Sequence, residues 1–117
     1  MKSVLATTLA LMTTAAQGIV IWYVSTEPGN AGVRQTWASE RWICDRQGHD
    51  ITEQYLDNNI SYAYVDRTGL GNGCTLFEDV GCKGESVSIK KSEVLGPGQV
   101  NLTDVNFDNR ASSWSCY

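Results

Sequence analysis

The segment that decides the fold is FDNRASS, at residues 107–113 of the 117-residue chain. An earlier segment, LDNNISY at residues 56–62, repeats its order of an apolar residue, Asp, Asn, two variable residues and Ser at an offset of 51 residues. A glycine also precedes each segment at a similar distance, 24 residues before Asp108 and 25 residues before Asp57. Because the segment and the glycine before it both recur at nearly the same spacing, the sequence predicts two copies of one structural unit.

Short strands separated by turn residues make up most of the chain after residue 18. The expected strands are rich in Val, Ile, Trp and Tyr, and Gly, Asn, Asp and Pro stand between them. They cover residues 19–25, 33–38, 62–66, 75–78, 86–90 and 113–117. Because no helical period of useful length is present, this pattern predicts an all-β sandwich.

Aromatic residues are concentrated in the first half, at Trp22, Tyr23, Trp37, Trp42, Tyr62 and Tyr64. Large rings are the usual material of a small core, so packing is the expected role of most of them. Any that are exposed would mark a binding face.

The N-terminal residues, 1–18, have the pattern of an export signal. Lys2 is followed by a short apolar run at residues 4–12 and then by small residues. We expect cleavage near residue 18, which leaves one domain at residues 19–117 and an extracellular location. No later stretch reaches the roughly 18 apolar residues of a membrane span, so none is expected.

Four cysteines follow this signal: Cys44, Cys74, Cys82 and Cys116. An even number after an export signal predicts two disulfides, and four cysteines allow three pairings. Zinc would need closely spaced ligand pairs, whereas these cysteines are 30, 8 and 34 residues apart and His49 is the sole histidine. The residues therefore favour disulfides and leave the pairing open.

The formal net charge of the chain is −4. An acidic surface repels phosphate backbones and anionic lipid headgroups. We therefore expect no nucleic-acid or membrane-surface partner. We expect a monomer, and the sequence names no protein or glycan partner.

The second half carries the motifs of a known family. Residues 77–84 read FEDVGCKG, and that family's hairpin has an aromatic, a second aromatic five positions later and a glycine two further on. Phe77 and Gly84 match this pattern, while Cys82 replaces the middle aromatic. The segment DNRASS at 108–113 matches the family's other signature, Asn/Asp–Asn/Asp–x–x–Ser/Thr–Ser. In these positions the chain resembles the βγ-crystallin Greek-key motif.

The first half departs from both motifs. Residues 57–61 match the second signature, but Tyr62 replaces its final serine. In the hairpin, Tyr23 lies nine residues before Gly32 instead of seven, and Pro28 stands where an aromatic is expected. The resemblance is therefore carried mainly by the second half.

With its export signal and cysteines, the chain is similar to the small secreted βγ-crystallin-like proteins of fungi. The resemblance implies a two-copy Greek-key β-sandwich of βγ-crystallin type, with copies at residues 19–66 and 74–117. In that family, the first and last strands of one copy lie side by side and antiparallel. The disulfides that this arrangement implies are Cys74–Cys116 and, by the remaining pair, Cys44–Cys82.

The resemblance also implies two candidate Ca²⁺ sites, each joining both copies. One would comprise Asp108, the carbonyl near Arg110, Ser112 and the hairpin around Glu27; the other would comprise Asp57, Asn59, Ser61 and Glu78. Calcium takes six to eight oxygen ligands, and one full carboxylate per site predicts weak affinity, roughly 10⁻⁴–10⁻³ M. The same residues also cap turns without any metal, and the sequence leaves that alternative open.

Enzymatic function is not expected. His49 would have to serve any nucleophilic system alone, and it is expected in a solvent-exposed loop. Paired cysteines are not nucleophiles, and Glu78 and Asp79, adjacent on a strand, would point to opposite faces. The resemblance implies a secreted, non-enzymatic, calcium-capable protein. The alternatives are an antimicrobial or killer-toxin-like protein, a host-directed effector or a protease inhibitor, and a small hydrolase is least favoured.

Overall fold

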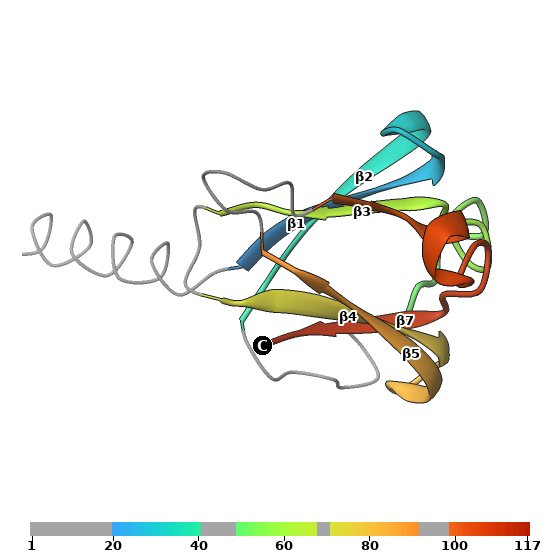
Figure 1. The fold of residues 1–117 in the computed structure, drawn as a ribbon. Helices are drawn as coiled ribbons and strands as arrows, with labels where there is room; N and C mark the ends of the chain where they lie inside the picture. The colour runs from blue at the N-terminus through green and yellow to red at the C-terminus, as the bar shows by residue number, and fades with distance from the viewer. Residues whose placement is uncertain (1–19, 41–48, 68–70, 92–98) are drawn as a thin grey trace, which may run out of the picture.

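The structure, a computed structural model, describes residues 20–40, 49–67, 71–91 and 99–117, which form two antiparallel sheets (Figure 1). Sheet A has the order β2-β1-β3-β6 and contains β1 (Val20–Glu27), β2 (Ala31–Ser39), β3 (Tyr62–Val65) and β6 (Gln99–Asn101). Sheet B has the order β5-β4-β7 and contains β4 (Gly73–Asp79), β5 (Lys83–Lys90) and β7 (Ser113–Cys116). A short 3₁₀ helix, η1 (Leu102–Val105), follows β6. The expected all-β sandwich is therefore confirmed.

Each sheet is completed by a segment of the other copy. In sheet A, β6 of the second copy pairs with β3 of the first. In sheet B, Asp50 of the first copy forms a bridge with Ser113 in β7, and the Trp114 N–H donates to the His49 carbonyl at 3.1 Å. The segment around Asp50 therefore pairs with β7 in sheet B in the same way that β6 pairs with β3 in sheet A. This exchange makes the two copies share one core.

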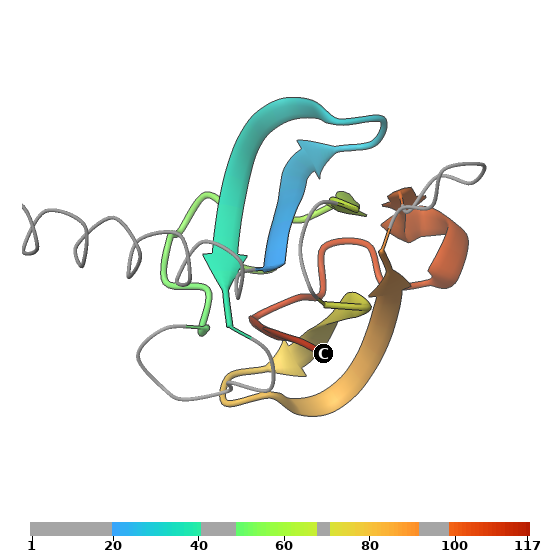
Figure 2. The ribbon, with the colours of Figure 1, turned by 90° about the vertical axis from the view of Figure 1, so that its left-hand side faces the viewer.

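The β1–β2 and β4–β5 hairpins lie on opposite sides of the molecule and turn in the same way (Figure 2). Asn30 and Cys82 occupy equivalent positions with φ of 62° and 56°. Gly32 and Gly84 follow with φ of 74° and 80°, a region that glycine enters without steric cost. The expected placement of Pro28 at the middle aromatic position was wrong, because Asn30 holds that position.

The expected alignment of Tyr23 with the first aromatic of the hairpin motif was also wrong. Register equates Ser25 in β1, not Tyr23, with Phe77 in β4. Ser25 lies seven residues before Gly32, which is the spacing of the family motif. The first hairpin therefore keeps the geometry of the second while lacking both aromatics, because positive φ at the turn does not depend on the rings.

Three tryptophans join the sheets. Trp22 in β1 is fully buried, with its ring centroid 5.4 Å from that of Trp37 in β2 and 5.3 Å from that of Trp114 in β7. The rings of Trp37 and Trp114 stack at 5.0 Å. Around them lies a core drawn from both copies that includes Val20, Val24, Leu56, Ile60, Leu76, Ile89, Leu102 and Phe107.

The expected disulfide between Cys74 and Cys116 is confirmed. The two residues are directly opposed on β4 and β7, with Cα atoms 3.9 Å apart. Cys82 is also disulfide-bonded, and none of the cysteines that the structure describes is free. Its expected partner, Cys44, lies outside the described residues, so the Cys44–Cys82 pairing stays a prediction.

Other expectations fall outside the described residues as well. The export signal at 1–18 and Trp42 lie there. Across the segments that the structure does describe, no helix has the length and apolar character needed to cross a bilayer.

Candidate calcium-binding loops

The two copies of the Asp–Asn–x–x–Ser signature form two neighbouring loops, which we call the first loop (residues 57–61) and the second loop (residues 108–112). They hold each other through reciprocal backbone hydrogen bonds: Asn58 N–H donates to the Ala111 carbonyl and Asn109 N–H to the Ile60 carbonyl, both at 3.0 Å. The two bonds relate equivalent positions, so the loops meet about the axis that relates the copies.

Asparagine at the second position of each loop has a conformational reason. Asn58 and Asn109 have φ of 54° and 58°, in the left-handed region that asparagine tolerates better than most residues. The signature is thus a backbone requirement as well as a set of oxygen donors.

Side-chain oxygens also meet between the loops. The Ser112 hydroxyl donates to Asp57 Oδ1 at 2.7 Å and lies 3.1 Å from Asn58 Oδ1. Its equivalent, Ser61, contacts Asn109 Oδ1 at 3.4 Å. The resemblance grouped each serine with the aspartate of its own loop, whereas these contacts run from one loop to the other. The serine hydroxyls therefore bridge the copies.

Asp108 breaks this symmetry. Its Oδ1 is buried and has no hydrogen-bond partner, while the equivalent oxygen of Asp57 accepts from Ser112. A buried, unsatisfied carboxylate oxygen is costly, because it loses water without gaining a partner. A bound cation would remove that cost.

The side chain of Arg110 is held away from a ligand role. Its Nη2 lies 3.1 Å from Glu78 Oε2 and 2.5 Å from Glu85 Oε2, and its Nη1 donates to the Asn106 carbonyl at 2.8 Å. The guanidinium also stands over the Phe107 ring at 4.9 Å. The hydrogen bonds to Glu85 and then Glu78 raise the pKa of Arg110. Two carboxylates thus offset the positive charge that sits in the second loop.

Two solved structures share this architecture. One, from work on the evolution of the eye-lens βγ-crystallin domain fold, matches with a TM-score of 0.59 and 18% identity over 86% of each chain. The other, a βγ-crystallin from an archaeon, matches with a TM-score of 0.55 and 16% identity over 84% of this chain and 98% of its own. The chain has the βγ-crystallin fold. No family model matches the sequence, and no curated protein is similar to it.

The remaining expected ligands of this βγ-crystallin-fold protein have other contacts. The Glu78 carboxylate is committed to the ion pair with Arg110. The Glu27 carbonyl accepts a hydrogen bond from the Ser25 hydroxyl at 2.8 Å, and the Asn59 amide donates to the Tyr55 carbonyl at 3.0 Å. Of the expected ligands, Asp57 and the two serines have side-chain oxygens in contacts between the loops. The amide oxygens of Asn58 and Asn109, which the sequence did not single out as ligands, take part in the same contacts.

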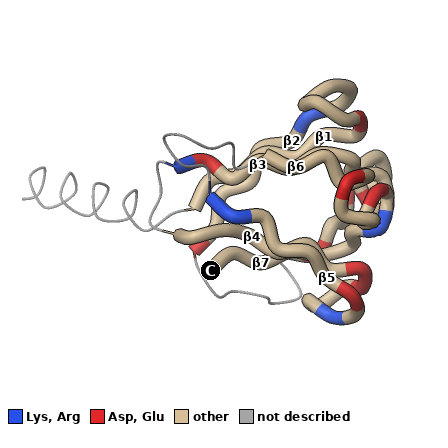
Figure 3. Tube along the Cα trace, viewed as in Figure 1, with Lys and Arg blue, Asp and Glu red and all other residues tan. Residues whose placement is uncertain are grey.

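The donor set suits a hard cation. Among the described residues, no group of three or more His, Cys, Asp or Glu side chains could hold a metal ion. The oxygens at the loops are instead carboxylate, amide and hydroxyl, the mixture that calcium accepts together with backbone carbonyls. Figure 3 shows acidic segments at the end of the sandwich that carries η1 and the hairpin tips, with basic segments between them.

The expectation for His49 was wrong. Its side chain is not in a solvent-exposed loop: the residue is 7% exposed, its Nε2 lies 2.6 Å from Ser39 Oγ, and its ring is 4.2 Å from Trp114. Because the adjacent bridge at Asp50 draws this segment onto sheet B, His49 enters the core. A serine–histidine contact resembles part of a nucleophilic triad, but the Ser39 hydroxyl donates its proton to the Glu40 carbonyl at 2.7 Å instead of to the His49 ring.

Proposed function

We propose that this chain is a secreted, non-enzymatic βγ-crystallin-like protein whose paired loops bind Ca²⁺ weakly. The observation that carries the proposal is the buried Oδ1 of Asp108 in the second loop, which has no hydrogen-bond partner. Secretion is supported by the N-terminal signal pattern and by the Cys74–Cys116 disulfide, since such bonds persist in oxidising compartments.

The chain's own residues fit a cation at this place. Asp108 would supply the carboxylate of one site, and Asp57, Asn58 and Ser112 already converge for the other. The Ser112 hydroxyl now donates to Asp57, and on binding it would turn its proton away and offer a lone pair. Calcium would add a charge that holds the two copies together, so its main effect is on stability.

Thermal unfolding in calcium and in chelator tests the proposal. With a Kd of about 1 mM, about 10 mM calcium stabilises the folded state by about 1.4 kcal/mol. For a domain of this size we expect Tm to rise by roughly 5–10 °C. Magnesium should have a much smaller effect, because it demands tighter octahedral geometry.

A matched pair of variants locates the effect. Asp108→Ala should abolish most of the calcium-dependent rise in Tm. Asp104→Ala also removes a carboxylate, but from η1 outside both loops, and should retain the rise. Identical melting curves of the wild-type protein in calcium and in chelator would show that the loops are turn caps only.

A further inference from the structure

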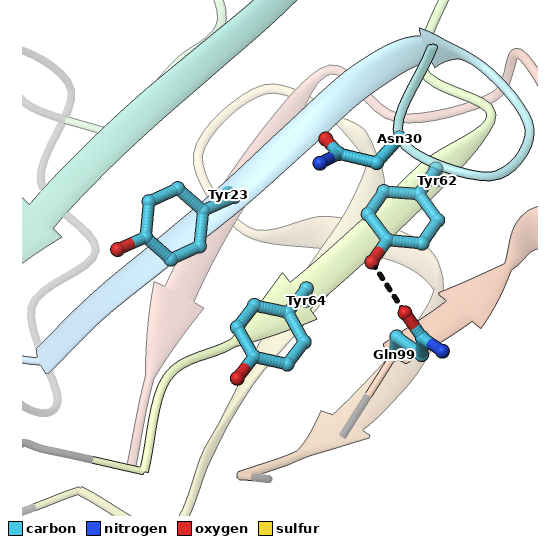
Figure 4. A pocket seen from close by; sticks show the side chains of 5 residues that line it. All are labelled: Tyr23, Asn30, Tyr62, Tyr64 and Gln99. Atoms are coloured by element: carbon cyan, nitrogen blue, oxygen red, sulfur yellow. Dashed lines mark hydrogen bonds between the residues drawn. The ribbon is translucent and has the colours of Figure 1, made fainter. Parts of the chain in front are cut away.

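The outer face of sheet A carries tyrosines that the core does not use. Along β3, Ala63 and Val65 point into the core and are fully buried, so Tyr62 and Tyr64 point to the opposite face. Tyr23 in β1 lies opposite Tyr64, and their rings stack with centroids 5.7 Å apart (Figure 4). Tyr23 and Tyr64 are half-buried and form a platform on the outside of the sandwich, and Tyr62 beside them is 5% exposed.

Sheet B shows that the fold does not require this platform. Its positions equivalent to Tyr23, Tyr64 and Tyr62 are Thr75, Ser115 and Ser113. These residues carry small hydroxyl side chains, and Thr75 bonds across the outer face to Ser88 at 2.9 Å. Phe77 on β4, opposite Ser113, is the counterpart of Tyr62, but sheet B has no ring that corresponds to Tyr23 or Tyr64, so these two tyrosines call for another explanation.

The platform lines a hollow of about 330 Å³ with two amide side chains, Asn30 and Gln99. The Tyr62 hydroxyl donates to Gln99 Oε1 at 2.8 Å, which orients the amide over the groove (Figure 4). A second hollow of about 370 Å³ shares Tyr62 and Gln99 with the first and continues past Asn101 to Asp104. Together they form one elongated groove across β1, β3 and β6, which we call the tyrosine groove.

The chemistry of the tyrosine groove selects a class of ligand. None of the side chains lining the first hollow carries a charge at neutral pH, and burial raises the pKa of Tyr62, which keeps its phenol neutral. Asp104 at the far end disfavours anions. Flat rings offer apolar faces, while amides and phenols both donate and accept hydrogen bonds. A pyranose ring has the matching features, an apolar C–H face and a rim of hydroxyls.

We propose that the tyrosine groove binds a neutral oligosaccharide. A sugar ring stacks on the Tyr23–Tyr64 pair, and its hydroxyls bond to Asn30 and Gln99. The next sugar lies in the second hollow, where the Asp104 carboxylate accepts from its hydroxyls. The length of the groove therefore favours a linear chain over a single sugar. This activity lies beyond the proposed calcium function and does not depend on it.

Calorimetric titration with cellohexaose, chitohexaose and laminarihexaose tests the proposal, with the protein in chelator so that calcium plays no part. We expect at least one of them to bind. Tyr64→Ala should weaken that binding by on the order of tenfold or more, because it removes half of the stacking platform. Ser115→Ala, at the equivalent position of sheet B, should leave the affinity unchanged.

Two further measurements keep the test decisive. Tyr64→Phe preserves the ring, so it should retain most of the affinity even if Tyr64→Ala fails to fold. A proline-rich decapeptide and a sulfated hexasaccharide serve as competing ligands. The proposal is overturned if none of the three neutral hexasaccharides binds, if only the peptide or the sulfated sugar binds, if Tyr64→Ala and Ser115→Ala have the same effect on the affinity, or if Tyr64→Phe loses the binding.

Discussion

In the second copy, Phe77 on β4 lies opposite Ser113 on β7, whereas in the first copy Ser25 on β1 lies opposite Tyr62 on β3. Each copy thus pairs one aromatic with one serine, but on exchanged strands. Both serines are fully buried. The two departures of the first copy from the family signature, a missing aromatic in β1 and a missing serine in β3, are therefore one compensated change.

The two serine hydroxyls donate to equivalent hairpin carbonyls, although they lie on different strands of their copies. The Ser113 hydroxyl donates to the Asp79 carbonyl at 2.5 Å and accepts from Cys82 N–H at 2.9 Å. The Ser25 hydroxyl donates to the Glu27 carbonyl at 2.8 Å, which is the position equivalent to Asp79. A hairpin carbonyl that turns away from the ladder needs a donor, and a hydroxyl on its own strand, as at Ser25, or on the neighbouring strand, as at Ser113, can supply it.

A second opposed pair also differs between the copies. Cys74 and Cys116 on sheet B correspond to Trp22 and Val65 on sheet A. The second copy secures this position with a covalent bond, and the first secures it by burying a large ring. This contrast and the exchanged serines each predict a measurable difference between the copies.

The largest expected effects come from this second pair. Trp22→Ala should lower the free energy of unfolding by about 3–5 kcal/mol, because it removes a fully buried ring from the core. Replacing both Cys74 and Cys116 by alanine opens a loop of 42 residues and should cost about 4 kcal/mol in the chain-entropy model. Denaturant unfolding under oxidising and reducing conditions separates them. Reductant should still destabilise Trp22→Ala; if it does not, the copies are not secured by independent means.

Smaller effects are expected at the exchanged serines. Ser113→Ala loses two hydrogen bonds and should cost about 1–3 kcal/mol, and Ser25→Ala loses one and should cost about 1 kcal/mol. A double-mutant cycle on Ser25→Phe and Tyr62→Ser imposes the arrangement of the second copy on the first. We expect the double variant to be more stable than the sum of the single changes predicts, by on the order of 1 kcal/mol. Strict additivity would mean that the exchange is not compensatory.

The smallest expected effect is alkaline sensitivity of the first copy. Burial raises the pKa of Tyr23 and Tyr62, with a further contribution from Asp66 at Tyr23 and from Tyr64 at Tyr62. A raised pKa in the folded state gives stability that is complete below the unfolded value of about 10 and is lost as pH rises through the folded pKa. Tm should therefore fall above about pH 10.

A phenylalanine variant tests whether the Tyr62 phenol causes this pH dependence of Tm. Tyr62→Phe should flatten the fall in Tm above about pH 10, because the phenol that must ionise is gone. Ser113→Ala, at the equivalent position of sheet B, should leave the shape of the pH profile unchanged while lowering stability throughout. If both variants keep the wild-type slope, the buried phenols of sheet A are not its source.

Much of the fold was predictable because its signals are local. Residues rich in Val, Ile, Trp and Tyr mark the strands, Gly32 and Gly84 supply the positive φ of the hairpins, and the repeated Asp–Asn–x–x–Ser segment reveals the two copies. The Cys74–Cys116 bridge followed from the strand order that the resemblance implied, and the observed register bears it out. In the first hairpin, the search for an aromatic chose Tyr23, because nothing local distinguishes it from a residue two positions along the strand.

The candidate site was predictable only in its residue types. Asp57, Asp108 and the two serines were named from the sequence, but the contact between Ser112 and Asp57 joins residues 55 positions apart. Likewise, the burial of His49 depends on its neighbour pairing with β7. Such contacts arise because each copy completes its sheet with a segment of the other. The secondary-structure preferences of neighbouring residues do not predict that exchange.

By itself, the sequence determined the strands, the turns and the existence of two copies, since each of these depends on residues close together along the chain. The tertiary structure alone decided which loop faces which and that Ser25 takes over the hydrogen bond made by Ser113 in the other copy. It also decided that the tyrosines of β1 and β3 face outward. The physical reason is that side-chain direction on a strand is known only relative to the core, and the core forms only when both copies come together.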